Sequence, residues 1–204
     1  MIEKYGKIAM INLKYNLFPY LLAAFVVCLV APLFIGIRNL DFFQSAKVIE
    51  MYLTFLGMIV FPPVFQPDLD REMSDVIRTK KEPVVTSYII RMSESFCAAF
   101  ILCVIFLSCM KSGNCEFPLG YGLAAFVSDI CFIGGIELVV FSFSGNPVLA
   151  YMVAILYYIA NIGLGPKLGV LYLFSMQTGK PADKLFLLTG GILCMILAIW
   201  HRRK

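Results

Sequence analysis

Residues 119–143 read LGYGLAAFVSDICFIGGIELVVFSF, a run of 25 residues in which only Asp129 and Glu137 carry a charge. A helix that crosses a bilayer needs about 20 consecutive, mostly apolar residues. This run therefore predicts a transmembrane helix. Five further apolar runs occupy residues 17–37, 46–65, 89–110, 148–162 and 185–200. The sequence thus predicts six transmembrane helices.

The composition of the whole chain agrees with this pattern. Of its 204 residues, 60% are hydrophobic and only 15% are charged, whereas soluble domains average about 45–50% and about 25%. Six spans of about 20 residues use roughly 120 residues, which leaves little for a soluble domain. We therefore expect residues 1–204 to form a single all-α polytopic membrane domain. The net charge of +4 is too small to indicate nucleic acid as a partner.

The distribution of Lys and Arg predicts the orientation of the six spans. Eleven of these residues lie on the side of the N-terminus, namely Lys4, Lys7, Lys14, Arg71, Arg78, Lys80, Lys81, Arg91, Arg202, Arg203 and Lys204. Six lie on the other side, namely Arg38, Lys47, Lys111, Lys167, Lys180 and Lys184. Because Lys and Arg are enriched in cytoplasmic loops, we expect a plasma (inner) membrane protein with both termini in the cytoplasm.

The first sixteen residues are amphipathic rather than apolar. Lys4, Lys7 and Lys14 share one narrow helical face, and Tyr5 and Leu13 lie on the opposite face. A basic face opposite an aromatic and aliphatic face is typical of a helix that lies in the membrane interface. The sequence therefore predicts an N-terminal interfacial helix, and the alternative is a loosely held terminus.

The fifth apolar run breaks at the sequence GLGPK, residues 163–167, and a second apolar piece at 168–176 is too short to cross a bilayer. Helix-breaking Gly and Pro leave backbone groups without partners unless protein or a water-filled cavity covers them. We therefore expect a re-entrant segment at the outer face. The alternative, one long kinked helix, would bury Lys167 in lipid at a cost of about 2.5–3.5 kcal/mol.

The longest predicted cytoplasmic segment lies between the second and third spans, at residues 66–88. Its acidic residues come first, as Asp68, Asp70, Glu72 and Asp75, and its basic residues come last, as Arg78, Lys80 and Lys81. This order complements a helix macrodipole, and Pro83 ends the helix. Met73, Val76 and Ile77 give it a small apolar edge. The segment therefore predicts a short helix that docks on a partner, and a solvated helix is the alternative.

This layout resembles the membrane subunit of a type-2 ABC exporter. Those permeases have a basic interfacial helix, six spans, a coupling helix between spans 2 and 3, and a re-entrant segment between spans 5 and 6. Their cytoplasmic loop typically reads Glu-x-Gly-Thr, some apolar residues, then Pro and a basic residue. This chain has Glu72, then Val76 and Ile77, then Pro83 and Arg91, with Ser74 and Asp75 in the Gly-Thr positions.

The resemblance implies a function and a set of partners. The chain would form the substrate path of an ATP-driven export complex, together with a second permease chain that is either identical or related. Its coupling residues would be Asp70, Glu72, Asp75, Val76, Ile77, Arg78 and Pro83. No GxxxxGK[ST] phosphate-binding loop occurs in the sequence. ATP and Mg²⁺ would therefore bind to a separate ATP-binding subunit, and this chain would bind no cofactor.

Charged and polar residues inside the spans are candidates for the substrate path. Asp129 and Glu137 are eight residues apart and share one helical face, and intramembrane carboxylates usually face the interior of a bundle. With Asn161 of the fifth span they could line the path, or they could form a structural pair. Arg91 and Glu94, at i and i+3, are expected to pair at the cytoplasmic mouth of the third span.

Two other functions are compatible with six spans. One is a substrate-capturing subunit of a vitamin-uptake transporter, but Ala23, Ala24 and Ala31 do not keep the AxxxA spacing by which those subunits dock. The other is an intramembrane enzyme, which usually needs a nucleophile with a base or a metal site, and the only histidine is His201. Among the seven cysteines, only Cys109 and Cys115 flank a loop and could form a disulfide.

Overall fold

The computed structural model describes Gly6, residues 9–69 and residues 84–203, and no strand occurs in these residues. Six helices within them are long and apolar enough to cross a membrane. They are α2 (Phe18–Ile35), α3 (Phe42–Val60), α5 (Val84–Ser112), α6 (Leu119–Ser144), α7 (Pro147–Leu164) and α8 (Asp183–Arg202). The chain is therefore an all-α polytopic membrane protein, as its composition predicts.

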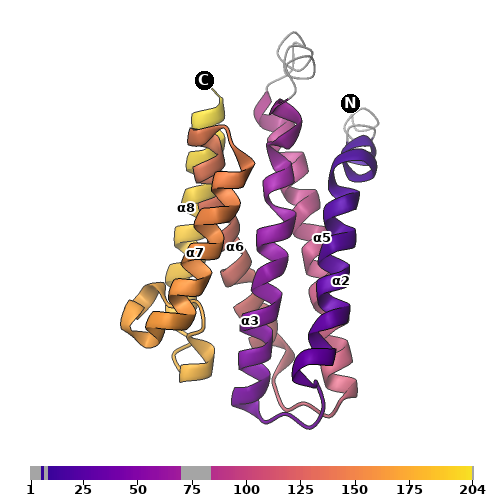
Figure 1. Ribbon diagram of the computed structural model, residues 1–204, viewed down its shortest axis with the longest axis vertical. Helices are drawn as coiled ribbons and strands as arrows, with labels where there is room; N and C mark the ends of the chain where they lie inside the picture. Colours follow the sequence, from indigo (N-terminus) through magenta and orange to yellow (C-terminus); the bar gives the residue numbers. More distant parts are fainter. Residues whose placement is uncertain (1–5, 7–8, 70–83, 204) are drawn as a thin grey trace.

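The helices run side by side along the long axis of the molecule (Figure 1). The described start of the chain and the end of α8 lie at one end of the bundle, together with the ends of α3 and α5 that flank residues 70–83. We call this the termini end. The connections from α2 to α3 and from α5 to α6 lie at the opposite end. Six crossings place the two chain ends on the same side, as expected.

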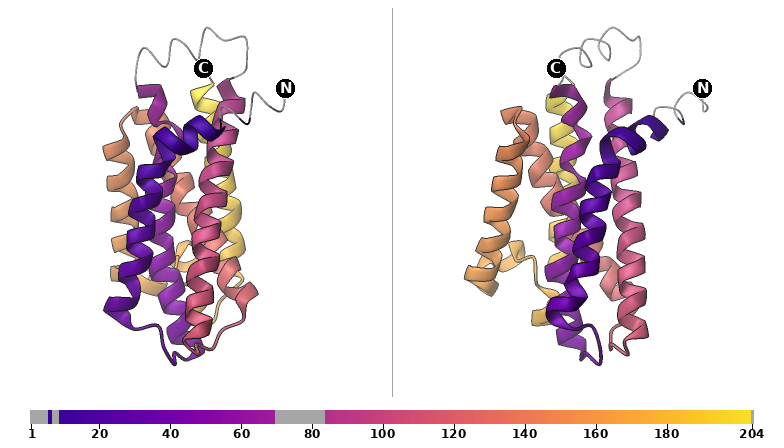
Figure 2. Two further views of the ribbon diagram at one scale, coloured as in Figure 1. Left: turned by 90° about the vertical axis from the view of Figure 1, so that its right-hand side faces the viewer. Right: turned by 45° about the vertical axis from the view of Figure 1, so that its right-hand side comes forward.

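The helix that leads into α2 changes direction. Residues 13–17 form a π-helical turn, and Pro19 lies in the first turn of α2. The preceding residues turn away from the axis of α2, as Figure 2 shows. Met10 and Tyr15 are largely exposed there, whereas Asn12 and Leu17 are buried. The described part of the predicted interfacial helix is thus helical and lies at an angle to the bundle, and residues 1–5 and 7–8 lie outside the described part.

Helix α6 is the centre of the bundle and packs against α3, α7 and α8. Its contact with α8 depends on glycine, since a Cβ added at Gly191 would lie 2.4 Å from the carbonyl carbon of Cys131. A Cβ added at Gly135 would lie 2.7 Å from the carbonyl oxygen of Gly191. Small residues at helix interfaces allow this close approach of two backbones. The two helices therefore form one closely packed pair.

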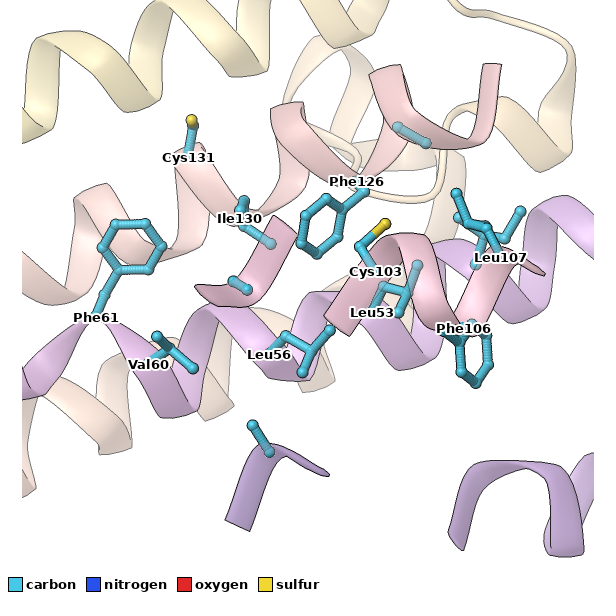
Figure 3. Close-up of a cluster of buried hydrophobic side chains, with 14 of the residues drawn as sticks. Leu53, Leu56, Val60, Phe61, Cys103, Phe106, Leu107, Phe126, Ile130 and Cys131 are labelled. Carbon is cyan, nitrogen blue, oxygen red and sulfur yellow. The ribbon is translucent and has the colours of Figure 1, made fainter. Parts of the chain in front are cut away.

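An apolar core fills the space between α3, α5 and α6 (Figure 3). Leu53 and Leu56 of α3 contribute to it, together with Cys103 of α5 and Phe126 and Ile130 of α6, and all five are buried. On the outer helices the large apolar side chains face outward instead, for example Leu22, Phe25 and Leu29 of α2 and Leu156 and Ile159 of α7. This apolar exterior is what a membrane-spanning bundle presents to lipid.

The chain folds back after α7 instead of continuing as one kinked helix. Helix α7 ends at Leu164, and Gly165 adopts a positive φ of 58°. A 3₁₀ helix follows at Gly165–Leu171, where Gly169 also has a positive φ. Residues 172–178, which we call the re-entrant segment, then enter the bundle, and residues 172–176 are all buried. Lys167 lies exposed in the turn that follows α7.

Cys109 and Cys115 are both free thiols in the structure. Cys109 is exposed on α5, whereas Cys115 is buried and its thiol donates to the carbonyl oxygen of Ile37 at 3.3 Å. Cys115 thus ties the connection between α5 and α6 to the connection between α2 and α3.

Candidate functional site

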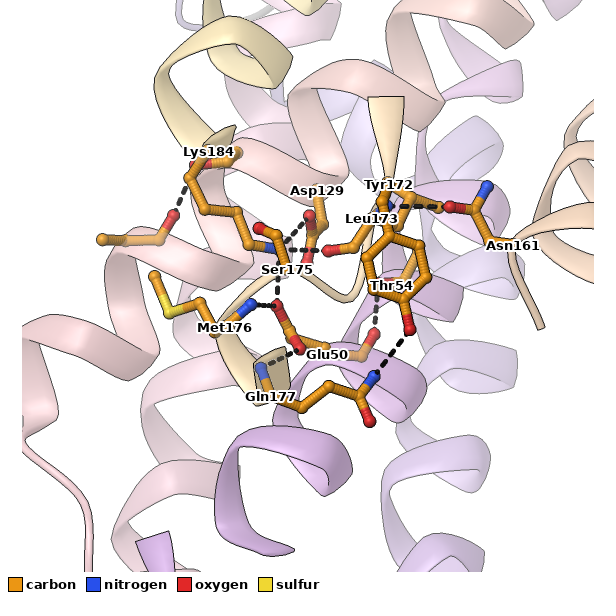
Figure 4. A network of polar contacts seen from close by, with 12 residues as sticks. Glu50, Thr54, Asp129, Asn161, Tyr172, Leu173, Ser175, Met176, Gln177 and Lys184 are labelled. Atoms are coloured by element: carbon orange, nitrogen blue, oxygen red, sulfur yellow. Dashed lines mark hydrogen bonds and ion pairs between the residues drawn. The ribbon is translucent and has the colours of Figure 1, made fainter. Parts of the chain in front are cut away.

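Three buried charged residues meet where the re-entrant segment enters the bundle (Figure 4). Glu50 comes from α3, Asp129 from α6 and Lys184 from the first turn of α8. Their exposed fractions are 1%, 1% and 3%. We call these three residues the ionic cluster. Charged residues are almost never buried this far unless they are paired, and here each one is.

Lys184 is the centre of the ionic cluster. Its Nζ lies 2.6 Å from Asp129 Oδ1 and 2.8 Å from Glu50 Oε1. It also donates to the backbone carbonyl oxygen of Leu173 in the re-entrant segment. An ammonium group has three hydrogens to donate. All three are used, so Lys184 binds two helices and the segment at once.

Glu50 holds the same segment from the opposite side. Its two carboxylate oxygens accept hydrogen bonds from the backbone N–H groups of Met176, at 2.8 Å, and Gln177, at 3.2 Å. Helix α3, which carries Glu50, begins with a capping box formed by Asp41 and Gln44. Hydrogen bonds to an ionised acceptor are stronger than neutral ones. The carboxylate therefore anchors the backbone of the segment.

Asn161 of α7 completes the attachment of the re-entrant segment. Its Oδ1 accepts a hydrogen bond of 2.8 Å from the N–H of Leu173, and its Nδ2 donates to the carbonyl oxygen of Tyr157. The Tyr157 hydroxyl donates to the carbonyl oxygen of Leu171. Leu173 thus bridges Asn161 and Lys184, since its N–H binds one and its carbonyl oxygen the other. Asp129 and Asn161, both candidates from the sequence, are therefore brought to one site.

The polar groups of this site are not all satisfied. Asp129 Oδ2 and the hydroxyl oxygen of Ser175 are buried and have no hydrogen-bond partner within residues 9–69 and 84–203. Tyr172 lies in the same segment, and its hydroxyl accepts from the side-chain amide of Gln177 at 3.5 Å.

Glu137, the third candidate for the substrate path, takes no part in the ionic cluster. It is completely buried in α6, and neither carboxyl oxygen has a hydrogen-bond partner among the described residues. Asp129 and Glu137 both face the interior, as expected, but each is enclosed within this one chain. Their eight-residue separation gives them different surroundings, because only Asp129 lies at the level of the re-entrant segment.

A second buried ion pair lies at the termini end. Arg91 Nη1 is 3.3 Å from Asp68 Oδ1 and 3.2 Å from the carbonyl oxygen of Val64. The Tyr88 hydroxyl donates to the other oxygen of Asp68. Glu94 instead accepts from Asn12 Nδ2 at 2.5 Å. Arg91 and Glu94 thus each have a partner outside α5, in place of the i, i+3 pair that the sequence predicts.

The proposed coupling residues lie outside the described residues. These are Asp70, Glu72, Asp75, Val76, Ile77, Arg78 and Pro83, all between 70 and 83. The structure does define where this part of the chain is attached, because Asp68 precedes it and Tyr88 and Arg91 follow it. No group of three or more His, Cys, Asp or Glu side chains suited to a metal ion occurs within the described ranges.

The sequence pattern does not single out Glu50 and Lys184 as site residues. Glu50 lies in the apolar run 46–65, where an ionisable residue suggests a function by default. Lys184 directly precedes the last apolar run, 185–200, and therefore reads as a loop residue. An acid in one span and a base at the edge of another can signal a buried pair, but the pairing itself depends on the tertiary fold.

Comparison of the chain with protein-family models, with curated proteins and with solved structures finds no match. Two buried ionic sites distinguish this fold: the ionic cluster that holds the re-entrant segment, and the Asp68–Arg91 pair next to residues 70–83.

Proposed function

We propose that this chain is the membrane subunit of an ATP-driven export complex and that it couples to a separate ATP-binding subunit through residues 70–83. In this proposal both termini and residues 66–88 lie in the cytoplasm. The observation that carries it is the buried contact of Asp68 with Arg91 and Tyr88, because it joins the two helix ends from which this charged stretch emerges.

A coupling segment has to transmit movement to the helices that line the path. Asp68 lies just beyond α3, while Tyr88 and Arg91 lie in the first turns of α5. The side chains of Arg91 and Asp68 are each only 9% exposed. Removing one partner of a buried ion pair costs about 3–5 kcal/mol. A force on residues 70–83 would therefore act on α3 and α5 together.

The residues that follow α3 also contact the other helices at the termini end. Asn16 donates to the carbonyl oxygen of Pro63 at 2.7 Å, which adds the start of the chain. The guanidinium of Arg202 lies 5.4 Å from the ring centre of Phe65, a cation–π contact from the end of α8. A displacement of residues 62–69 would thus reach the N-terminal helix and α8 as well as α5.

The ionic cluster has a structural part in this proposal. Asn161 holds the re-entrant segment directly and Asp129 holds it through Lys184, within one chain, so their contacts favour a role in closing the end opposite the termini. Glu137 lies nearer the termini end, where an exporter would admit its substrate, and it remains the candidate for the substrate path. A second permease chain and two ATP-binding subunits that carry ATP and Mg²⁺ would complete the transporter.

The proposal is tested by purifying the full-length chain, with an affinity tag, from membranes of its own host in mild detergent. We expect an ATP-binding subunit to co-purify in about equal amount. The charge reversal Glu72→Lys with Asp75→Lys should lower its recovery and uncouple ATP hydrolysis from transport. The matched control is Asp183→Lys, a reversal at the opposite end, which should leave recovery unchanged. If no ATP-binding protein is recovered, or if the double reversal changes neither recovery nor transport, the proposal fails.

A further inference from the structure

The ionic cluster contains two acids and one base in a fully buried place. If Glu50 and Asp129 were both ionised, the site would carry one uncompensated negative charge. Burying an unpaired charge is costly, and a group in that position takes up a proton to become neutral. One acid of the cluster therefore has to hold a proton as long as the site stays closed to water.

The hydrogen bonds identify which acid holds it. Glu50 receives three donors on its two oxygens, one from Lys184 and two from the backbone of the re-entrant segment. A proton on Glu50 would point at groups that already donate. Asp129 receives only Lys184, on Oδ1, and its Oδ2 has no partner among the described residues. Oδ2 of Asp129 is therefore the position that accommodates a proton without losing an existing hydrogen bond.

The groups around Asp129 do not provide a second positive charge. The titratable residues that interact with it are Glu50 on α3, Lys184 on α8 and Tyr157 on α7. Tyr172, on the re-entrant segment, interacts with the other two members of the cluster. Lys184 is the single base in this set, and its three donors are already used. A proton is thus the one missing charge of the cluster.

We propose that Asp129 is a binding site for one exchangeable proton, and that this proton controls how tightly the re-entrant segment is held in the bundle. With the proton bound, the cluster is neutral and Lys184 and Glu50 hold the segment at Leu173, Met176 and Gln177. When Asp129 gives up its proton to water, a negative charge remains in the bundle. Water must then enter to solvate it, and the segment has to loosen to admit that water.

The direction of the pH dependence follows from this. The closed position of the segment favours protonated Asp129, and the open position favours the ionised form. Rising pH therefore weakens the hold on the segment, and falling pH strengthens it. The inference concerns only this chain and does not depend on an ATP-binding subunit.

The first test uses infrared difference spectroscopy on the full-length chain in lipid vesicles across a pH titration. We expect the C=O stretching band of a protonated carboxylic acid, which shifts when the aspartate carboxyl groups carry an isotope label and is absent from Asp129→Asn. The band is also absent from Glu50→Gln, because that variant leaves one acid to balance Lys184. Glu137 is another buried acid whose band could overlap with that of Asp129. All spectra are therefore compared in proteins that also carry Glu137→Gln. If the band of the Glu137→Gln protein survives Asp129→Asn, or if no such band exists, Asp129 holds no proton and the proposal is overturned.

The second test follows the amide hydrogens of residues 172–178 by hydrogen–deuterium exchange, corrected for the intrinsic effect of pH. In the wild-type chain we expect protection to fall at least tenfold as pH rises. Asp129→Asn imitates the protonated acid, so it should keep the segment protected at every pH, whereas Glu50→Gln should lower protection at every pH. Glu137→Gln is the control and should match the wild type. Protection that does not vary with pH in the wild type contradicts the proposal, even if Asp129→Asn fails to fold.

Discussion

Lys184 Nζ lies 2.6 Å from Asp129 Oδ1, so the first turn of α8 is tied to the middle of α6 across 55 residues of sequence. The same ammonium group donates to Leu173 in the re-entrant segment. This one side chain therefore fixes both the position of α8 and the fold of the chain that leads into it. Loss of the Lys184 side chain should therefore disturb both elements at once.

Lys184→Met is expected to destabilise the protein by about 3–5 kcal/mol, because it leaves buried carboxyl groups without their base. Thermal unfolding of the purified chain in detergent, followed by the fluorescence of Trp200, would measure this loss. The matched control is Lys180→Met, four residues away on an exposed position, which should change stability by no more than about 0.5 kcal/mol. Equal stability of the two variants would show that the ionic cluster contributes little.

Gly191→Ala is expected to force α8 away from α6, because the added Cβ would meet the backbone of Cys131 at 2.4 Å. Backbone atoms cannot move aside as a flexible side chain can, and overpacking of this kind costs about 1–3 kcal/mol. Gly163→Ala is the matched control, since a Cβ there meets nothing within 4 Å and alanine favours the helix. The same unfolding measurement would separate them, and a neutral Gly191→Ala would refute the close packing of α6 and α8.

Local signals in the sequence predict much of the fold. Long apolar runs with few charges define the six helices, and the glycines and Pro166 after the fifth run mark the place where the chain turns back. Both signals are local. The apolar runs follow from the apolar interior of the bilayer, and the turn follows from the backbone geometry of Gly and Pro. Gly134–Gly135 in α6 and Gly190–Gly191 in α8 likewise indicate a close approach of helices, although not that these two helices pack against each other.

The candidate site is harder to predict because its contacts join distant parts of the chain. Asp129 and Asn161 attract notice as polar residues in apolar runs. Leu173, which binds Asn161 directly and Asp129 only through Lys184, is an ordinary apolar residue that acts through its backbone. Arg91 illustrates the same limit. The i, i+3 rule offers Glu94, whereas the tertiary fold brings Asp68 to Arg91 and Asn12 to Glu94.

Asp68→Asn is expected to weaken the connection between the end of α3 and the start of α5. The change removes the charge that Arg91 and Tyr88 bind and leaves the guanidinium buried without a counter-ion, a loss of about 3–5 kcal/mol. Transport and ATP hydrolysis by the assembled complex should then become uncoupled, while insertion into the membrane stays normal. The double variant Asp68→Asn with Arg91→Gln removes both charges and should recover part of the stability. If the double variant is as unstable as Asp68→Asn alone, the two residues do not act as a pair.

The orientation of the chain gives the last prediction. Eleven Lys and Arg residues on the side of the termini against six on the other predict that the termini lie in the cytoplasm and that Gly179 lies outside. In a variant with all seven native cysteines replaced, a cysteine at Gly179 should react with a membrane-impermeant thiol reagent added to intact cells, since this residue is exposed at the end opposite the termini. A cysteine at Arg203 should react only after the membrane is permeabilised. Labelling of position 203 in intact cells would reverse the orientation and place residues 70–83 outside, where no ATP-binding subunit could reach them.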